Sequence, residues 1–227
     1  MRVGRRGAVL AITLLLAATG CGRMVNGAAR TDPHEPGTAI TGDGFGIITG
    51  RPDAKAQIEV YTEPQCSHCA HLQGQYGPTL RTLINIGDLA VTYRPVTFLD
   101  QGQSTYSARV TNALFIAAGH GTSGPAFQSF VEDVWGHQQP YGTGPTDAEL
   151  SDMAGESHVS GEAVALIKAA QPAVRTDDMT TANVARLQSI LRASAATPTV
   201  FDLNRNKVVD ITKPDWVAKV MSSKMTT

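Results

Sequence analysis

The chain has 227 residues, of which 42% are hydrophobic and 17% charged, enough to bury the core of one large domain or two small ones. Its formal net charge is −1 and its pI is about 6.6, so the chain lacks the basic excess of a nucleic-acid-binding protein. Three cysteines are too few for a scaffold held together by disulfides.

The first twenty residues have the layout of a secretory signal peptide. Several arginines precede an apolar run from Ala8 to Ala18, which is about half the length that spans a bilayer, roughly 20 residues. Small residues then lead to Cys21, and this ending resembles the signal of bacterial lipoproteins, in which the cysteine is lipidated. The resemblance implies that residues 1–20 are removed and that Cys21 anchors the protein on the extracytoplasmic face of the cell membrane. Ordinary signal peptidase cleavage would instead leave Cys21 a free thiol.

The next segment, residues 21–44, is rich in small and polar residues without apolar periodicity, which predicts a flexible tether. A single domain is expected over 45–221. Within it, alternation predicts a strand over 57–62, helical spacing of apolar residues predicts a helix over 66–86, and a second strand is expected over 89–98. Because a helix between parallel strands makes a right-handed crossover, these elements predict a βαβ unit.

Residues 104–195 have almost no strand signal and predict a block of helices. The expected helices are 104–119, 125–135, 146–155, 161–170 and 178–195, the third opening on a capping box at Thr146. The chain then returns to β structure. A hairpin is expected from strands 199–203 and 207–211, followed by a last helix up to Met221.

One cluster of residues has chemistry of its own, namely Cys66-Ser67-His68-Cys69 between the first strand and its helix. Backbone N–H groups and the positive end of the helix dipole stabilise a thiolate at Cys66. His68 adds a cation or a donor in the same turn. Cys69 is one turn further in and suits a resolving thiol, which attacks a mixed disulfide at Cys66. The pattern is typical of a redox site.

Other uses of this cluster are less favoured. A structural disulfide between Cys66 and Cys69 would close so small a loop that it stabilises by only about 2 kcal/mol, against about 4.7 for a 100-residue loop. A zinc site would also need His68 and His71, but adjacent helical residues point to different sides and zinc ligands usually come from two segments. Attached haem needs a histidine where Ala70 stands. We therefore expect no metal and no cofactor.

These residues resemble the DsbA-like branch of the thioredoxin superfamily over about residues 45–221. The resemblance rests on Glu63-Pro64-Gln65-Cys66-Ser67-His68-Cys69 after a strand and on Thr197-Pro198-Thr199-Val200-Phe201 at a strand start. It implies a thioredoxin-like α/β fold, a mixed sheet flanked by helices, with a helical insertion of about 104–195 between the βαβ unit and a C-terminal ββα unit. It also implies a cis-proline at Pro198, beside the first cysteine.

The chain departs from this pattern at two positions. Ser67 stands where many relatives have proline, and Val60 stands where many have a buried acid, six residues before the first cysteine. Glu59 should point to the opposite face of the strand from Val60, because side chains alternate. Glu63 is the nearest substitute for the missing acid.

The resemblance implies an extracytoplasmic protein disulfide oxidoreductase. Cys66 would be the attacking thiolate, Cys69 the resolving thiol, and His68 would tune the pKa of Cys66, while Thr197 and Pro198 would hold the substrate backbone. We favour an oxidase that introduces disulfides into cysteine-containing secreted or cell-envelope proteins and is reset by a membrane redox partner. The alternatives are a disulfide reductase or isomerase, and a non-catalytic thioredoxin-like lipoprotein that binds a partner or carries a metal. No nucleic-acid partner is expected.

Overall fold

The computed structural model describes residues 35–139 and 142–222. The predicted signal peptide, Cys21 and most of the predicted tether lie outside these residues. The strands are β1 (Gly37–Ile40), β2 (Ile47–Gly50), β3 (Ala56–Thr62), β4 (Leu89–Pro95), β5 (Thr199–Asp202) and β6 (Lys207–Val208). The helices are α1 (Ser67–Asn85), α2 (Tyr106–Gly119), α3 (Gly124–Gly136), α4 (Asp147–Glu156), α5 (Gly161–Lys168), α6 (Thr176–Leu191) and α7 (Trp216–Met221).

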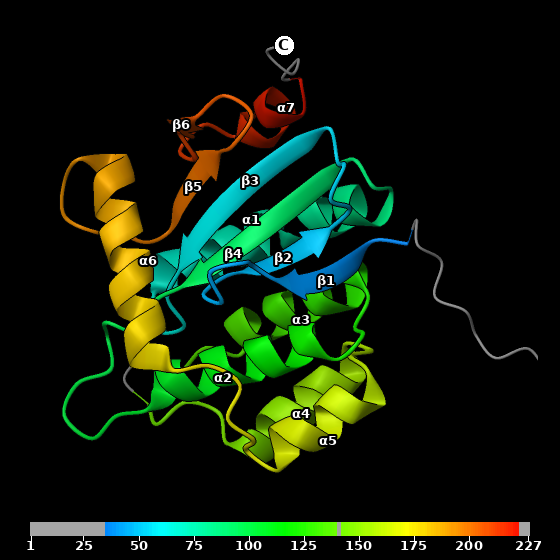
Figure 1. Cartoon of the computed structure of the whole chain (residues 1–227), viewed down its shortest axis with the longest axis vertical. Coiled ribbons are helices and arrows are strands. Elements are labelled where there is room, and N and C mark those ends of the chain that lie inside the picture. The colour runs from blue at the N-terminus through cyan, green and yellow to red at the C-terminus, as the bar shows by residue number, and fades with distance from the viewer. Residues whose placement is uncertain (1–34, 140–141, 223–227) are drawn as a thin grey trace, which may run out of the picture. The chain divides into compact units, whose positions relative to one another are not determined.

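The strands form one mixed sheet in the order β1-β2-β4-β3-β5-β6. Helix α1 runs along one face of the sheet, α6 lies on the other, and α4 and α5 lie beyond α2 and α3 (Figure 1). Helices α2 to α6 all fall between β4 and β5. The predicted α/β fold with a helical insertion is therefore confirmed. In the part of the chain that the structure describes, no helix is both long enough and apolar enough to cross a membrane.

The first two strands correct the predicted extent of the tether. β1 pairs antiparallel with β2, and β2 pairs antiparallel with β4, so the prediction of a tether over 21–44 is wrong for residues 37–44. The Thr38 hydroxyl also donates to the carbonyls of Ala118 and Thr122, 2.9 Å from each. Strands this short are stabilised by hydrogen bonds to neighbouring strands and by packing against the helical block. These contacts come from other segments, so the sequence of the strands themselves does not reveal them.

β3 lies at the centre of the sheet, and its pairing brings its carboxyl end to the start of β5. β3 is parallel to β4 and antiparallel to β5, with Tyr61 opposite Thr199. Ile58 and Val60 are fully buried in the same hydrophobic core as Leu72 of α1. The carboxyl end of β3 thus meets the start of β5, and the chain turns there into α1.

The opposite face of β3 carries a buried ion cluster. Glu59, 3% exposed, accepts hydrogen bonds from Arg94 on β4 (3.2 Å), Arg186 on α6 (3.0 Å) and the Tyr61 hydroxyl (2.9 Å). The prediction that Glu59 points away from the Val60 face is therefore correct. These ionic contacts help to fix α6, which precedes the segment at Thr197, against the sheet.

Candidate active site

The two cysteines of the predicted redox cluster lie at the first turn of α1. Cys66 is the N-cap residue of the helix, and the backbone N–H groups of Cys69 and Ala70 both donate to its carbonyl. Cys66 is partly exposed, whereas Cys69 is 1% exposed and belongs to the hydrophobic core. Both are free thiols in this structure. One sulfur can therefore meet a protein substrate, and the other is shielded from it.

The surroundings of Cys66 stabilise its thiolate. The Cys69 thiol donates a hydrogen bond to the Cys66 sulfur, and the Thr197 side chain and the backbone N–H groups of Cys69 and His68 add further hydrogen bonds. Together they outweigh the cost of partial burial and lower the pKa of Cys66 from 9.0 to about 5. This sulfur is thus ionised at neutral pH.

Cys69 has the opposite electrostatics. Burial raises the pKa of its thiol strongly, and the adjacent Cys66 sulfur raises it further, despite hydrogen bonds from the Glu63 backbone and the Thr62 side chain. Cys69 therefore stays protonated at physiological pH. The pair combines one thiolate and one thiol, as an exchange reaction through a mixed disulfide requires.

The segment before β5 lies directly against Cys66. The Thr197–Pro198 peptide bond is cis, as the resemblance implies, and the Cys66 sulfur is 3.4 Å from the Thr197 carbonyl oxygen. The pairing of Tyr61 with Thr199 explains this contact, because it places the residues before β5 beside the residues after β3. Residues 131 positions apart in the chain thus form one site.

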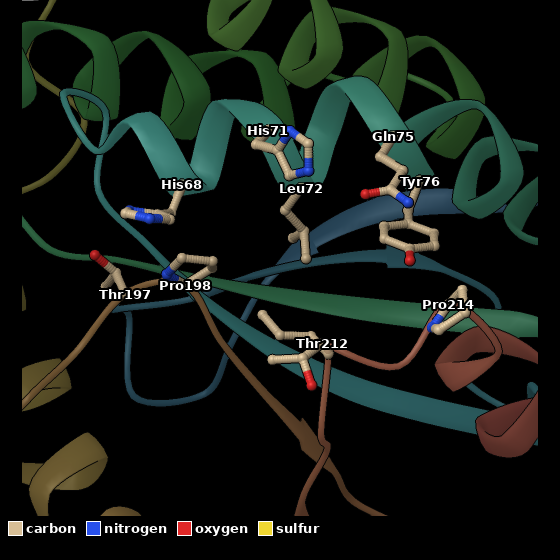
Figure 2. Close-up of a pocket in the computed structure, with 10 residues that line it drawn as sticks. His68, His71, Leu72, Gln75, Tyr76, Thr197, Pro198, Thr212 and Pro214 are labelled. Atoms are coloured by element: carbon tan, nitrogen blue, oxygen red, sulfur yellow. The ribbon is translucent and has the colours of Figure 1, made fainter.

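A groove of about 510 Å³ extends from this site along α1. Figure 2 shows His68, Leu72 and Tyr76 on one side, facing Thr197–Pro198 and the Thr212–Pro214 segment. The complete lining is His68, His71, Leu72, Gln75, Tyr76, Thr197, Pro198, Ile211, Thr212 and Pro214. The groove includes Thr197, whose carbonyl contacts the Cys66 sulfur, and it contains both apolar and polar side chains, which suits an extended peptide.

The structure gives His68 a different role from the predicted one. Its side chain is exposed and lines the groove, and it is the backbone N–H of His68 that hydrogen-bonds to the Cys66 sulfur. The predicted influence of His68 on Cys66 therefore acts through the backbone. Among the described residues, no group of three or more histidine, cysteine or acidic side chains is arranged to hold a metal ion.

Sequence reasoning missed a buried polar network behind the site. Glu63 is fully buried and accepts hydrogen bonds from the Gln65 backbone N–H (2.6 Å) and from the Ser107 hydroxyl. The Gln65 side chain donates to Asp100 (2.9 Å) and to Ser107 (3.0 Å). Asp100 in turn accepts from the backbone N–H groups of Ser107 and Ala108 at the start of α2. The network attaches the loop before Cys66 to the helical insertion, and no local sequence signal connects these segments.

Comparison with known proteins agrees with this geometry. A family model described as Thioredoxin matches residues 43–219. Part of the serine/threonine-protein kinase PknE of Mycobacterium tuberculosis is 27% identical to this chain over 182 residues, or 78% of this chain. The match covers 31% of the kinase, so the chain spans less than a third of the length of this curated relative.

Several solved structures share the fold. The MdbA protein of Corynebacterium diphtheriae, a thiol-disulfide oxidoreductase, superposes with a TM-score of 0.68 at 22% identity, over 82% of this chain and 93% of that one. DsbA of Mycobacterium tuberculosis has a TM-score of 0.59 at 24% identity, over 78% and 89% of the two chains. The reduced disulfide bond oxidoreductase DsbG of the same organism has a TM-score of 0.58 at 26% identity, over 75% and 80%.

Proposed function

The chain belongs to the thioredoxin family, and we propose that it is an extracytoplasmic thiol–disulfide oxidoreductase that works as an oxidase on secreted or cell-envelope proteins. The observation that carries the proposal is the contrast between its two thiols. Cys66 is partly exposed with its pKa lowered to about 5, and Cys69 is buried with its pKa raised. An exposed thiolate backed by a shielded thiol is the arrangement that disulfide exchange uses.

The proposed cycle moves two electrons from a substrate to the protein. A substrate thiolate attacks the Cys66 sulfur of the Cys66–Cys69 disulfide, and Cys69 leaves. A second thiolate of the same substrate then attacks the substrate sulfur that is bonded to Cys66. The substrate disulfide forms, and Cys66 leaves as a thiolate. A membrane redox partner would return the dithiol to the disulfide. The groove beside Thr197 and Pro198 would hold the substrate backbone during both steps.

Two assays on the purified protein test this proposal together. The oxidised protein is mixed with a reduced, unfolded protein whose activity returns only when its disulfides form, and the reduced protein is tested for insulin reduction. An oxidase restores activity in the first assay faster than it reduces insulin in the second. Insulin reduction alone would favour the reductase or isomerase, and inactivity in both assays would favour a binding protein.

We expect the groove to contribute to substrate affinity. Ile211 lines it at the side opposite α1, and replacing an apolar contact of this size by a charge removes about 1.5 kcal/mol or more of burial. Ile211→Glu should therefore raise the KM for a reduced peptide substrate by about tenfold and leave the redox potential unchanged. The measurement is steady-state peptide oxidation at several substrate concentrations.

Ile86→Glu is the matched control for this prediction. Ile86 is 60% exposed at the far end of α1, about 30 Å along the helix from Cys66. Its substitution should leave KM at the wild-type value. Equal KM values for wild type and Ile211→Glu would show that substrates do not use the groove.

We further propose that Cys21 anchors the protein to the extracytoplasmic face of the cell membrane. The support is the sequence alone: a short apolar run that ends in small residues and Cys21. Cys21→Ala should move the protein from the membrane fraction to the soluble fraction, and mass spectrometry should find lipid on Cys21 of wild type. A membrane-bound variant, together with an unmodified Cys21 in wild type, would contradict the anchor.

A further inference from the structure

The two histidines of the groove have no partner within the described protein. His68 and His71 both line the groove, His68 beside Pro198 and His71 one turn further along α1 (Figure 2). Both residues are exposed, and neither side chain forms a hydrogen bond or an ion pair with another residue that the structure describes. Their ring nitrogens are therefore available to a molecule that occupies the groove.

Two histidines elsewhere on the surface show what the groove lacks. A ring nitrogen of His120 lies 3.1 Å from a Glu162 oxygen, and a ring nitrogen of His137 lies 3.0 Å from an Asp133 oxygen. Each of these histidines thus faces a carboxylate of the protein itself. Among the described residues that line the groove, none is acidic, and Tyr76 is the one titratable side chain besides the two histidines. A carboxylate for the groove histidines would therefore come from the bound molecule.

The charged residues on the opposite side of the groove have partners or neighbours of their own. The Asp210 carboxylate accepts hydrogen bonds from the Thr212 backbone N–H (3.1 Å) and from the Thr212 hydroxyl (2.6 Å). Asp210 and Lys213 both line a separate cavity, so their opposite charges lie together there. On α7, Asp215 pairs with Lys219 at 2.8 Å. Because a histidine is positive once it takes up a proton, protonation gives the groove a positive charge that no acidic side chain of its lining offsets.

The charge at one end of the groove depends on the oxidation state of the protein. Thr197 lines the groove, and its carbonyl oxygen is 3.4 Å from the Cys66 sulfur. In the disulfide this sulfur is neutral, whereas in the dithiol it is a thiolate, because its pKa is lowered to about 5. A negative charge nearby is repelled by the thiolate and not by the disulfide. An acidic substrate would therefore bind the oxidised protein more tightly than the reduced one.

We propose that the groove selects substrates with an acidic side chain close to the reacting cysteine, and that His68 and His71 bind its carboxylate. This inference rests on the proposed exchange at Cys66 and names the class of substrate. His71 is five residues from Cys66 along α1, or about 7.5 Å. An extended peptide covers that distance with about two residues. The aspartate or glutamate is therefore expected two residues from the substrate cysteine.

The test compares reduced peptides with two cysteines that carry Asp, Asn or Lys two residues outside each cysteine and are otherwise identical. Oxidised protein is mixed with each peptide at pH 6, and reduction of the Cys66–Cys69 disulfide is followed by thiolate absorbance. Each rate is divided by the rate of the same peptide with a small uncharged disulfide, which removes differences in thiol reactivity. The Asp peptide should react about fivefold faster than the Lys peptide, and this ratio should fall at pH 8 as histidine loses its charge.

His71→Glu should invert the preference, so that the Lys peptide reacts faster than the Asp peptide. Thr79→Glu is the matched control, because Thr79 is exposed on the same helix and lies outside the groove lining. It adds a carboxylate to α1 and should keep the wild-type ratio. Equal rates of the Asp and Lys peptides with wild type at pH 6, or a ratio that His71→Glu leaves unchanged, would overturn the inference.

Reduction by a small uncharged dithiol separates this result from the proposed function. A protein that the dithiol reduces, but that reacts equally with all three peptides, has the exchange reaction at Cys66 without the selectivity, and only the inference on the groove fails. A protein whose disulfide neither the dithiol nor any peptide reduces lacks the exchange itself, and both proposals fail.

Discussion

Replacing Cys69 by serine is expected to turn the protein into a covalent trap for its substrates. In wild type, the buried Cys69 thiol lies next to the Cys66 sulfur and resolves a mixed disulfide from inside the protein. Because this attack is intramolecular, it is far faster than attack by a thiol from solution. Cys69→Ser removes this thiol and leaves the Cys66 thiolate, so adducts at Cys66 should persist with a substrate that has a single cysteine and therefore no second thiol to release Cys66. Turnover of dithiol substrates should be lost, because the Cys66–Cys69 disulfide can no longer form.

The measurement starts from Cys69→Ser protein whose Cys66 carries a small chromogenic thiol. Adding a protein substrate that has a single cysteine releases that thiol and leaves a substrate adduct, which non-reducing gels and mass spectrometry detect. Cys66→Ser is the matched control, because it retains only the shielded Cys69 and should give no adduct. Adducts on Cys69 in that control, or adducts of Cys69→Ser that decay as fast as those of wild type, would contradict the assigned roles.

The chemistry of the site could be predicted from sequence because it depends on neighbours in the chain. Two cysteines three residues apart at a strand-to-helix turn already distinguish an exposed thiol from a shielded one. The orientation of Glu59 followed from strand alternation, and its contacts with Arg94 and Arg186 confirm it. In each case the deciding interaction lies within one helical turn or one strand.

Contacts across the sheet could not be predicted in the same way. That Thr197 touches Cys66 depends on the pairing of Tyr61 with Thr199, and only resemblance to a family indicated it. The burial of Glu63 depends on Ser107 at the start of α2, which no periodicity connects to the loop before Cys66. β1 was missed for a related reason, since its stability comes from its partners. The packing of segments that are distant in the chain therefore determines both the shape of the groove and the surroundings of Glu63.

The direction of electron flow is expected to appear in how the redox potential varies with pH. The pKa of Cys66 in the dithiol is depressed to about 5 from 9.0, so the stabilisation of the dithiol is fully present above pH 9 and is lost as pH falls through 5. At pH 7 the ionisation of Cys66 stabilises the dithiol, relative to one with an ordinary thiol, by the equivalent of about two pKa units. This stabilisation corresponds to a rise of about 60 mV in the redox potential. That gain raises the potential from thioredoxin's, about −270 mV, toward the isomerase and oxidase range.

Equilibration with glutathione between pH 4 and 8 checks this expectation. The potential should change by about 60 mV per pH unit below the Cys66 pKa, where reduction takes up two protons, and by about 30 mV above it, where it takes up one. The break should lie near pH 5. Thr197→Val removes a hydrogen bond to the Cys66 sulfur and should move the break to higher pH. Thr212→Val, in the same groove, should leave it in place.

A slope of about 60 mV per pH unit maintained up to pH 8, with a potential as low as thioredoxin's, would exclude the oxidase. It would mean that Cys66 is protonated in the dithiol, despite the hydrogen bonds from Cys69 and Thr197. The exchange reaction at Cys66 would remain possible in that case, but it would run toward reduction of the substrate. Because a stable Cys66 thiolate favours the dithiol form of the protein, the position of the break decides between the two directions.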